Sequence, residues 1–199
     1  WMDDVRIWNI ARTPSDVVAT RFTRMNGNEP GLVANWHFDE GSGSVSADLV
    51  AGIPVTIDNA RWVSDCNCNA LDDARETLPF GNEYSLNFVQ ELLKSRVTLP
   101  DNLIRNRGNT LTFEAWFRAN HFEGGPILGM QLGDISNCFS VCGEWVPVVY
   151  IGFDGKLRGE FWQGAAAPIT TAHRVTDNEW HHVALVGNVN TQSMYLDGA

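Results

Sequence analysis

Polar and apolar positions alternate along most of the chain with the period of a β-strand. Seven short segments show this pattern and are bounded by turn-forming residues: SLNF (85–88), RVTLP (96–100), TLTFEAWFRA (110–119), PVVYIGF (147–153), LRGEFWQ (157–163), WHHVALVG (180–187) and SMYLDG (193–198). In LTFEAWF, Leu111 and Phe113 share one face, and Thr112 and Glu114 share the other. Apolar residues occupy both faces, which predicts a strand packed on both sides.

One segment has the signals of a helix. In TPSDVVATRFTRM, Thr13 is placed as an N-cap, Pro14 occupies the first helical position and Asp16 lies in the first turn. The apolar positions on one side are Val17, Val18 and Phe22. Repeated short strands with one short helix after the first strand predict an all-β fold, an antiparallel β-sandwich or jelly roll.

The alternation lapses for about twenty residues in the segment SDCNCNALDDARETLPFGNEY, which is long for a connection inside a compact domain. We therefore predict a first part in residues 1–64, a linker or boundary in residues 65–79, and a second part in residues 80–199.

The composition and charge of the chain argue against some classes of binding partner. The chain has 199 residues, of which 44% are hydrophobic and 11% aromatic, and a formal net charge of −10. This charge argues against nucleic acid and against anionic membranes, and it is compatible with bound cations. The sequence has no apolar run of the roughly 18 to 20 residues that span a bilayer, so we expect no membrane insertion.

The four cysteines form two close pairs, Cys66 with Cys68 and Cys138 with Cys142. A disulfide within CxC would close a strained ring. We therefore favour disulfides between the pairs, or Cys138 with Cys142 while the other two bridge elsewhere. A zinc site is the competing interpretation, but neither pair has the CxxC spacing of a zinc knuckle. Disulfides would require an oxidising compartment.

Four motifs resemble the laminin G-like jelly-roll domains of the concanavalin A-like lectin/glucanase superfamily: WMDDVRIWNIARTPSDV, GLVANWHFDEGSGSVSADLVAG, LTFEAWFRAN and NEWHHVALVGNVNTQSMYLDGA. The resemblance implies a non-catalytic module, extracellular or at the cell surface, that acts in adhesion or in surface or filament assembly. Its partners would be other copies or neighbouring domains of the same protein. The alternative is a carbohydrate-binding module or appendage of a secreted polysaccharide-degrading enzyme.

The order of these motifs differs from the order in the family, because the family's closing strand, DDVRIW, comes first here. One interpretation is a window of a tandem array, with the end of one jelly roll in residues 1–64 and most of the next in residues 80–199. The other is a single permuted sandwich, or strand donation between neighbouring copies.

Catalytic chemistry has little support in the sequence. Neighbouring residues of a strand point to opposite faces, so His181 and His182 cannot bind one ion or act as a dyad. Glycoside hydrolases of this fold need closely spaced carboxylates along one strand, whereas Glu114 and Glu160 each appear isolated in their strands. We expect no catalytic residues.

Two binding sites are predicted. Calcium takes six to eight oxygen ligands, and a structural calcium would use Asp3, Asp39, Glu40 and Asp48, together with carbonyl oxygens of the glycine-rich turn at 41–43. Glycans bind exposed aromatic rings flanked by planar polar groups. The candidates for such a site are Trp145, Trp162 and Gln163, whereas Trp8, Trp36, Trp116 and Trp180 are predicted to be packed.

Overall fold

The fold is all-β. The computed structural model describes residues 1–64, 84–88, 95–100, 103–104, 108–120, 124–131, 145–161 and 167–199. These residues contain fourteen strands and one helix: β1 (Met2–Trp8), α1 (Pro14–Thr20), β2 (Leu32–Trp36), β3 (Val45–Ala47), β4 (Pro54–Asp58), β5 (Ala60–Ser64), β6 (Tyr84–Phe88), β7 (Arg96–Thr98), β8 (Thr110–Arg118), β9 (Gly125–Gln131), β10 (Trp145–Ile151), β11 (Lys156–Gly159), β12 (Ile169–Arg174), β13 (Trp180–Asn188) and β14 (Thr191–Leu196). All strand pairs are antiparallel, as predicted for a jelly roll.

The chain forms two compact units. The first contains Trp1–Arg118 and Glu179–Ala199, and the second contains Ala119–Asn178. The first unit holds a seven-stranded sheet in the order β14-β13-β8-β1-β6-β5, with β2 also paired to β1, and a three-stranded sheet in the order β3-β4-β7. The second unit holds a four-stranded sheet in the order β12-β11-β10-β9.

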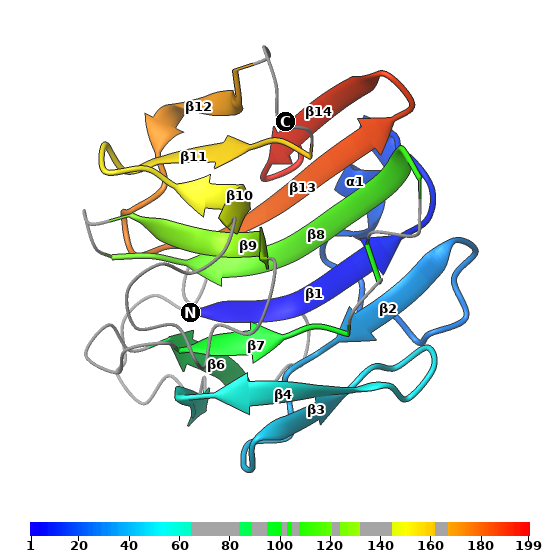
Figure 1. The fold of residues 1–199 in the computed structure, drawn as a ribbon, viewed down its shortest axis with the longest axis vertical. Helices are drawn as coiled ribbons and strands as arrows, with labels where there is room; N and C mark the ends of the chain where they lie inside the picture. Colours follow the sequence, from blue (N-terminus) through cyan, green and yellow to red (C-terminus); the bar gives the residue numbers. More distant parts are fainter. Residues whose placement is uncertain are drawn as a thin grey trace. The chain divides into compact units, whose positions relative to one another are not determined.

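Strand β1 lies in the middle of the seven-stranded sheet (Figure 1). It pairs with β8 along one edge, and with β6 and β2 along the other. Residues 1–64 and residues 80–199 therefore contribute strands to one sheet. The boundary at residues 65–79 stays a prediction, and so does the choice between a window of a tandem array and a single permuted or strand-swapped sandwich.

One face of this sheet is apolar and carries the core. Ile7, Phe113 and Leu185 are cross-strand neighbours on β1, β8 and β13, and all three are buried. The predicted packing of LTFEAWF on both sides is confirmed, because Thr112 and Glu114, on the other face, are fully buried too.

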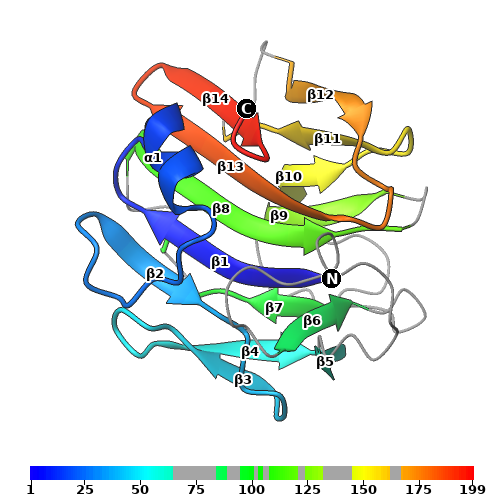
Figure 2. The same cartoon turned by 180° about the vertical axis from the view of Figure 1, so that it is seen from behind.

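Helix α1 lies over that other face of the sheet, which we call the helix face (Figure 2). The helix begins as predicted, with Thr13 as the N-cap: its hydroxyl accepts a hydrogen bond from the Asp16 backbone N–H, and the Asp16 carboxylate accepts one from the Thr13 N–H. The Thr13 hydroxyl also donates to the Asp16 carboxylate, and this bond together with the one from the Thr13 N–H lowers the pKa of Asp16. The predicted apolar side is only partly correct, because Val17 is buried whereas Val18 and Phe22 are exposed.

Strands β13 and β14 form a hairpin around Val189 and Asn190. A second two-residue turn follows β14. Asp197 and Gly198 have φ angles of 54° and 89°, the signs of a type I′ turn. Leu196 and Ala199 each donate a backbone hydrogen bond to the other, at 3.0 Å, and so close this turn as the first rung of a hairpin does.

Candidate functional site

The helix face is built from rows of side chains that run across β1, β8 and β13. Cross-strand pairing places the residues of each row side by side on one face. The four rows are Trp1–Arg118–Trp180, Asp3–Trp116–His182, Arg6–Glu114–Ala184 and Trp8–Thr112–Val186. Polar and charged residues thus occupy the middle of the helix face. Residues 10–24 of the same chain cover this face.

A β-bulge in β1 concentrates acidic groups at these rows. The register shifts between Asp3 and Arg6, so these two residues, three apart in sequence, lie on the same face. Asp4 occupies the bulge with a positive φ of 45° and forms a short ion pair with Arg6. The Asn35 side-chain amide donates to the second oxygen of Asp4 at 2.9 Å.

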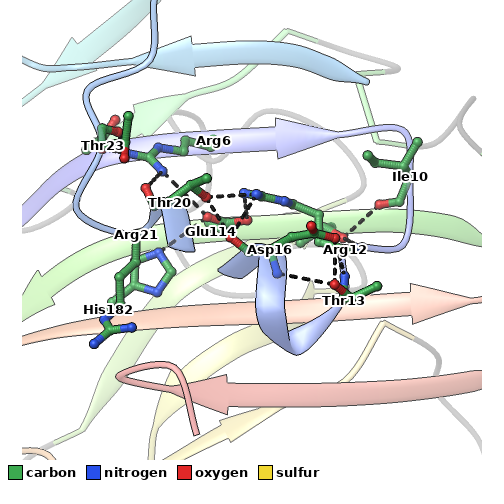
Figure 3. Close-up of polar contacts among 12 residues, drawn as sticks. Arg6, Ile10, Arg12, Thr13, Asp16, Thr20, Arg21, Thr23, Glu114 and His182 are labelled. Carbon is green, nitrogen blue, oxygen red and sulfur yellow. Dashed lines mark hydrogen bonds and ion pairs between the residues drawn. The ribbon is translucent and has the colours of Figure 1, made fainter. Parts of the chain in front are cut away.

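Glu114 lies at the centre of a buried ionic network (Figure 3). Its carboxylate is 2.8 Å from Nη1 of Arg12, 3.4 Å from Nε2 of His182 and 3.8 Å from Nη1 of Arg6. Burial by itself raises the pKa of Glu114, but the contact with His182 and the positive charges of Arg12 and Arg6 outweigh the effect of burial, so the pKa is lowered overall. Glu114 is therefore an ionised, enclosed carboxylate.

The two arginines fasten the segment around α1 to the sheet. Arg6 donates to the carbonyl oxygens of Thr20 and Thr23, at 3.0 and 2.8 Å. Arg12 donates to the Asp16 carbonyl at 3.1 Å and to the Thr20 hydroxyl at 2.7 Å. Each arginine therefore joins a buried carboxylate to the helix or to the turn after it, as Figure 3 shows.

The rows end in a cluster of rings and guanidinium groups that reaches the surface. We call it the aromatic–arginine surface; its members are Trp1, Arg21, Phe22, Trp116, Arg118 and Trp180. Phe22 and Trp116 have ring centroids 5.3 Å apart, and Trp1 packs against Trp116 and Trp180. Phe22 is 44% exposed, whereas Trp116 and Trp180 are buried.

The sequence analysis predicted neither the ionic network around Glu114 nor the aromatic–arginine surface. It treated Glu114 as an isolated carboxylate, and the structure corrects this by surrounding Glu114 with Arg6 of β1, Arg12 of the segment before α1 and the imidazole of His182 on β13. Charged residues inside otherwise apolar strands, Arg6 in VRIW and Glu114 in FEAWF, are the signal that could have predicted a buried pair.

The two adjacent histidines behave as predicted. His181 contacts Asp197 through Nδ1 at 2.9 Å and lies near the ring of Phe117, while His182 faces Glu114 and Trp116. They occupy opposite faces of β13. The predicted packing of Trp8, Trp36, Trp116 and Trp180 is also confirmed, since all four are buried.

The carboxylates proposed for calcium lie in separate settings. Asp3 is buried on the helix face, Asp39 pairs with Arg24 at 2.6 Å, and Glu40 accepts a hydrogen bond from the backbone N–H of Ala47, in β3, at 3.3 Å. Both oxygens of Asp48 accept backbone N–H bonds. Within the part of the chain that the structure describes, no group of three or more His, Cys, Asp or Glu could hold a metal ion. The described residues thus fit calcium poorly, and the calcium site stays a prediction.

The other predicted sites fall largely outside the described residues. Trp162, Gln163 and all four cysteines, Cys66, Cys68, Cys138 and Cys142, lie there. Trp145 begins β10, but its side chain is not described. The glycan site and the disulfides therefore stay predictions.

The antiparallel sheets define an all-β jelly-roll sandwich. The family model of the concanavalin A-like lectin/glucanases superfamily, in its laminin G-like form, matches residues 93–199. The chain belongs to this family. No curated protein and no solved structure gives a significant match. Domains of this class are generally non-catalytic and extracellular, and they bind carbohydrates or proteins. No helix among the described residues could cross a membrane.

Proposed function

We propose that this chain is a non-catalytic extracellular module that binds other copies or neighbouring domains of the same protein, in adhesion or in building a surface structure. The observation that carries the proposal is the rung between Leu196 and Ala199, at the outer edge of β14. It supports binding by strand addition, in which an extended segment pairs with the edge of a sheet.

The hydrogen bonds of β14 show which of its backbone groups face the outer edge of the sheet. Asp197 donates its backbone N–H to the carbonyl of His182, so the backbone N–H and C=O of Asp197 face β13. Those of Leu196, the preceding residue, face away from β13. Ala199 forms hydrogen bonds with the outward-facing backbone groups of Leu196. It therefore occupies the position that a residue of a neighbouring antiparallel strand would take. Within the described residues, β14 pairs otherwise only with β13. A strand at the edge of a sheet favours pairing with a further strand.

Both side-chain oxygens of Asp197 stabilise this turn. One accepts from the His182 backbone N–H at 2.8 Å and the other contacts His181 at 2.9 Å. These two contacts fix the conformation of the turn. A fixed turn determines the register of any strand that pairs with β14 beyond it.

The setting of Glu114 supports a non-catalytic role. A general acid of a glycosidase needs a raised pKa and access to the substrate. Glu114 has a lowered pKa and is fully buried.

Native mass spectrometry across a concentration series tests this proposal. Leu196 is the cross-strand neighbour of buried Val183, so Leu196→Asp places a charge on the core side of the edge strand. We expect self-association of the parent chain and its loss in Leu196→Asp, with Thr191→Asp, at an exposed position of the same strand, as the matched control. A chain that stays monomeric at every concentration would contradict the proposal.

A further inference from the structure

The loop between α1 and β2 contains an electrophile and a nucleophile side by side. Asn26 precedes Gly27, and this is the only place in the sequence where glycine follows asparagine. The side-chain carbonyl carbon of an asparagine is an electrophile, and the backbone nitrogen of the next residue is held close to it by the chain itself. Glycine has no Cβ, so it hinders the approach of its own nitrogen least.

The packing of the loop requires glycine at position 27. Gly27 has a φ angle of 88°, which residues with a side chain rarely adopt. A Cβ at this position would lie 2.8 Å from the backbone carbonyl oxygen of Leu49. The fold therefore disfavours every other residue after Asn26. Asn26 itself is exposed, so water has access to its side chain.

A carboxylate contacts the nucleophilic N–H group. The backbone N–H of Gly27 donates to Oε2 of Glu29 at 3.0 Å, and the backbone N–H of Asn26 donates to Oε1 at 2.9 Å. The two bonds fix the carboxylate against the dipeptide. A carboxylate within hydrogen-bond distance of a reacting N–H is placed to accept its proton, so Glu29 has the position of a general base.

A second backbone group polarises the electrophile. The N–H of Asn28 donates to Oδ1 of Asn26 at 3.1 Å. When a nitrogen adds to Cγ of Asn26, negative charge develops on Oδ1. An N–H that already points at this oxygen stabilises the charge, as the donors of an oxyanion hole do. Residues 26–29 therefore supply a nucleophile, a base and an oxyanion donor.

We propose that residues 26–29 form a self-modifying site that deamidates Asn26. The Gly27 nitrogen bonds to Cγ of Asn26 while its proton passes to Glu29. The side-chain nitrogen of Asn26 then takes up that proton and leaves as ammonia, and a cyclic imide joins the two residues. Water opens the imide at one carbonyl carbon to give aspartate, or at the other to give isoaspartate. The complete reaction consumes one water and releases one ammonia.

The reaction changes both the charge and the length of the loop. Either product adds a carboxylate next to Glu29, and the like charges repel each other. Isoaspartate also lengthens the backbone where Gly27 packs against Leu49. The residue before the dipeptide, Met25, is buried in the core, so a looser loop weakens its packing. Because the ammonia is lost, the change is one-way, and the converted fraction increases with the age of the protein.

The test follows Asn26 in the 199-residue chain by peptide mapping and mass spectrometry during incubation at neutral pH. Conversion replaces an amino group with a hydroxyl group, which changes the mass of the peptide, and chromatography separates aspartate from isoaspartate. We expect the folded chain to convert faster than the same chain in urea, because only the folded loop fixes the base and the oxyanion donor. Asn28, exposed in the same loop, should stay unmodified.

Glu29→Gln should slow conversion of the folded chain about a hundredfold, the lower end of what a positioned general base contributes. Glu40→Gln, which removes an exposed carboxylate from another loop, is the matched control and should leave the rate unchanged. The proposal is overturned if the folded chain converts more slowly than the unfolded chain, or if Asn28 converts equally. A Glu29→Gln variant with the parent circular dichroism spectrum and the parent rate would also overturn it. If Glu29→Gln does not fold, the comparison of the folded and unfolded parent chain decides.

Discussion

Glu114 and the two arginines beside it show why charged residues can occupy buried strands. An enclosed carboxylate is costly unless several partners neutralise it. Arg12, Arg6 and His182 supply these partners from three separate segments. The network therefore forms only when β1, β8, β13 and the segment before α1 are correctly placed together, and it makes the packing of the helix face specific.

We predict that Glu114→Gln destabilises the fold by about 3–5 kcal/mol, because the substitution removes the carboxylate that pairs with the buried guanidinium of Arg12. The free energy of unfolding from urea titration measures this. Glu40→Gln, at an exposed position, should change stability by no more than about 0.5 kcal/mol. Equal effects of the two substitutions would contradict a structural role for the network.

His37 makes stability depend on pH. Burial lowers the pKa of His37 below its ordinary value of 6.5, and the charges of Arg24 and Arg6 lower it further, while Asp4 and Asp39 oppose them. The unfolded chain therefore takes up a proton before the folded chain does. The contribution of His37 is fully present above about pH 6.5 and is lost as the pH falls towards the lower, folded-state pKa.

We expect the unfolding midpoint in urea to fall between pH 7 and pH 5, and His37→Gln to reduce this slope. His173→Gln, at an exposed position of β12, is the matched control and should leave the slope unchanged. A slope that is identical in all three proteins would contradict the assignment to His37.

At the scale of elements, the sequence predicted those features that are determined by residues close together in the chain. The Thr13 cap and the alternation in β8 both follow from patterns within about ten residues, and the structure contains both of them. The bulge at Asp4 was not predictable, because it is defined by the register between β1 and β8. The exposure of Val18 and Phe22 was missed because α1 buries only Val17 and ends at Thr20, before Phe22.

We predict that Thr13→Ala destabilises the chain by about 1 kcal/mol, because the N-terminal N–H groups of α1 lose their side-chain acceptor. Thermal unfolding followed by circular dichroism measures the change. Thr13→Ser keeps the hydroxyl and should restore most of the stability. If Ser and Ala have the same effect, the cap does not stabilise this seven-residue helix.

At the scale of the molecule, the predicted fold class is confirmed, but the arrangement of its parts could not be derived from local patterns. Strands were assigned from alternation, whereas the partner of β1 depends on residues about a hundred positions away. The helix-face network was missed for the same reason. Its members lie in four segments whose proximity only the assembled sheet creates.

The cysteines provide a test at this scale. We predict that Cys66, Cys68, Cys138 and Cys142 form disulfides, because their spacings do not suit a zinc knuckle and the family is typically extracellular. Alkylation without reductant should leave the intact mass unchanged, and alkylation after reduction should add four groups. Alkylation of all four without reductant, or one bound zinc per chain, would contradict the prediction.

The central position of β1 has a consequence for how the chain reaches its fold. Arg12, just after β1, and its partner Glu114 are 102 residues apart in sequence, so a long loop must close before the middle of the sheet exists. Closing such a loop costs entropy that the contacts recover only afterwards. Topologies dominated by distant pairings fold in milliseconds to seconds rather than microseconds. A chain emerging from the ribosome would hold β1 without its β8 neighbour until Thr110–Arg118 had been synthesised, and its exposed edges would meanwhile be open to other chains.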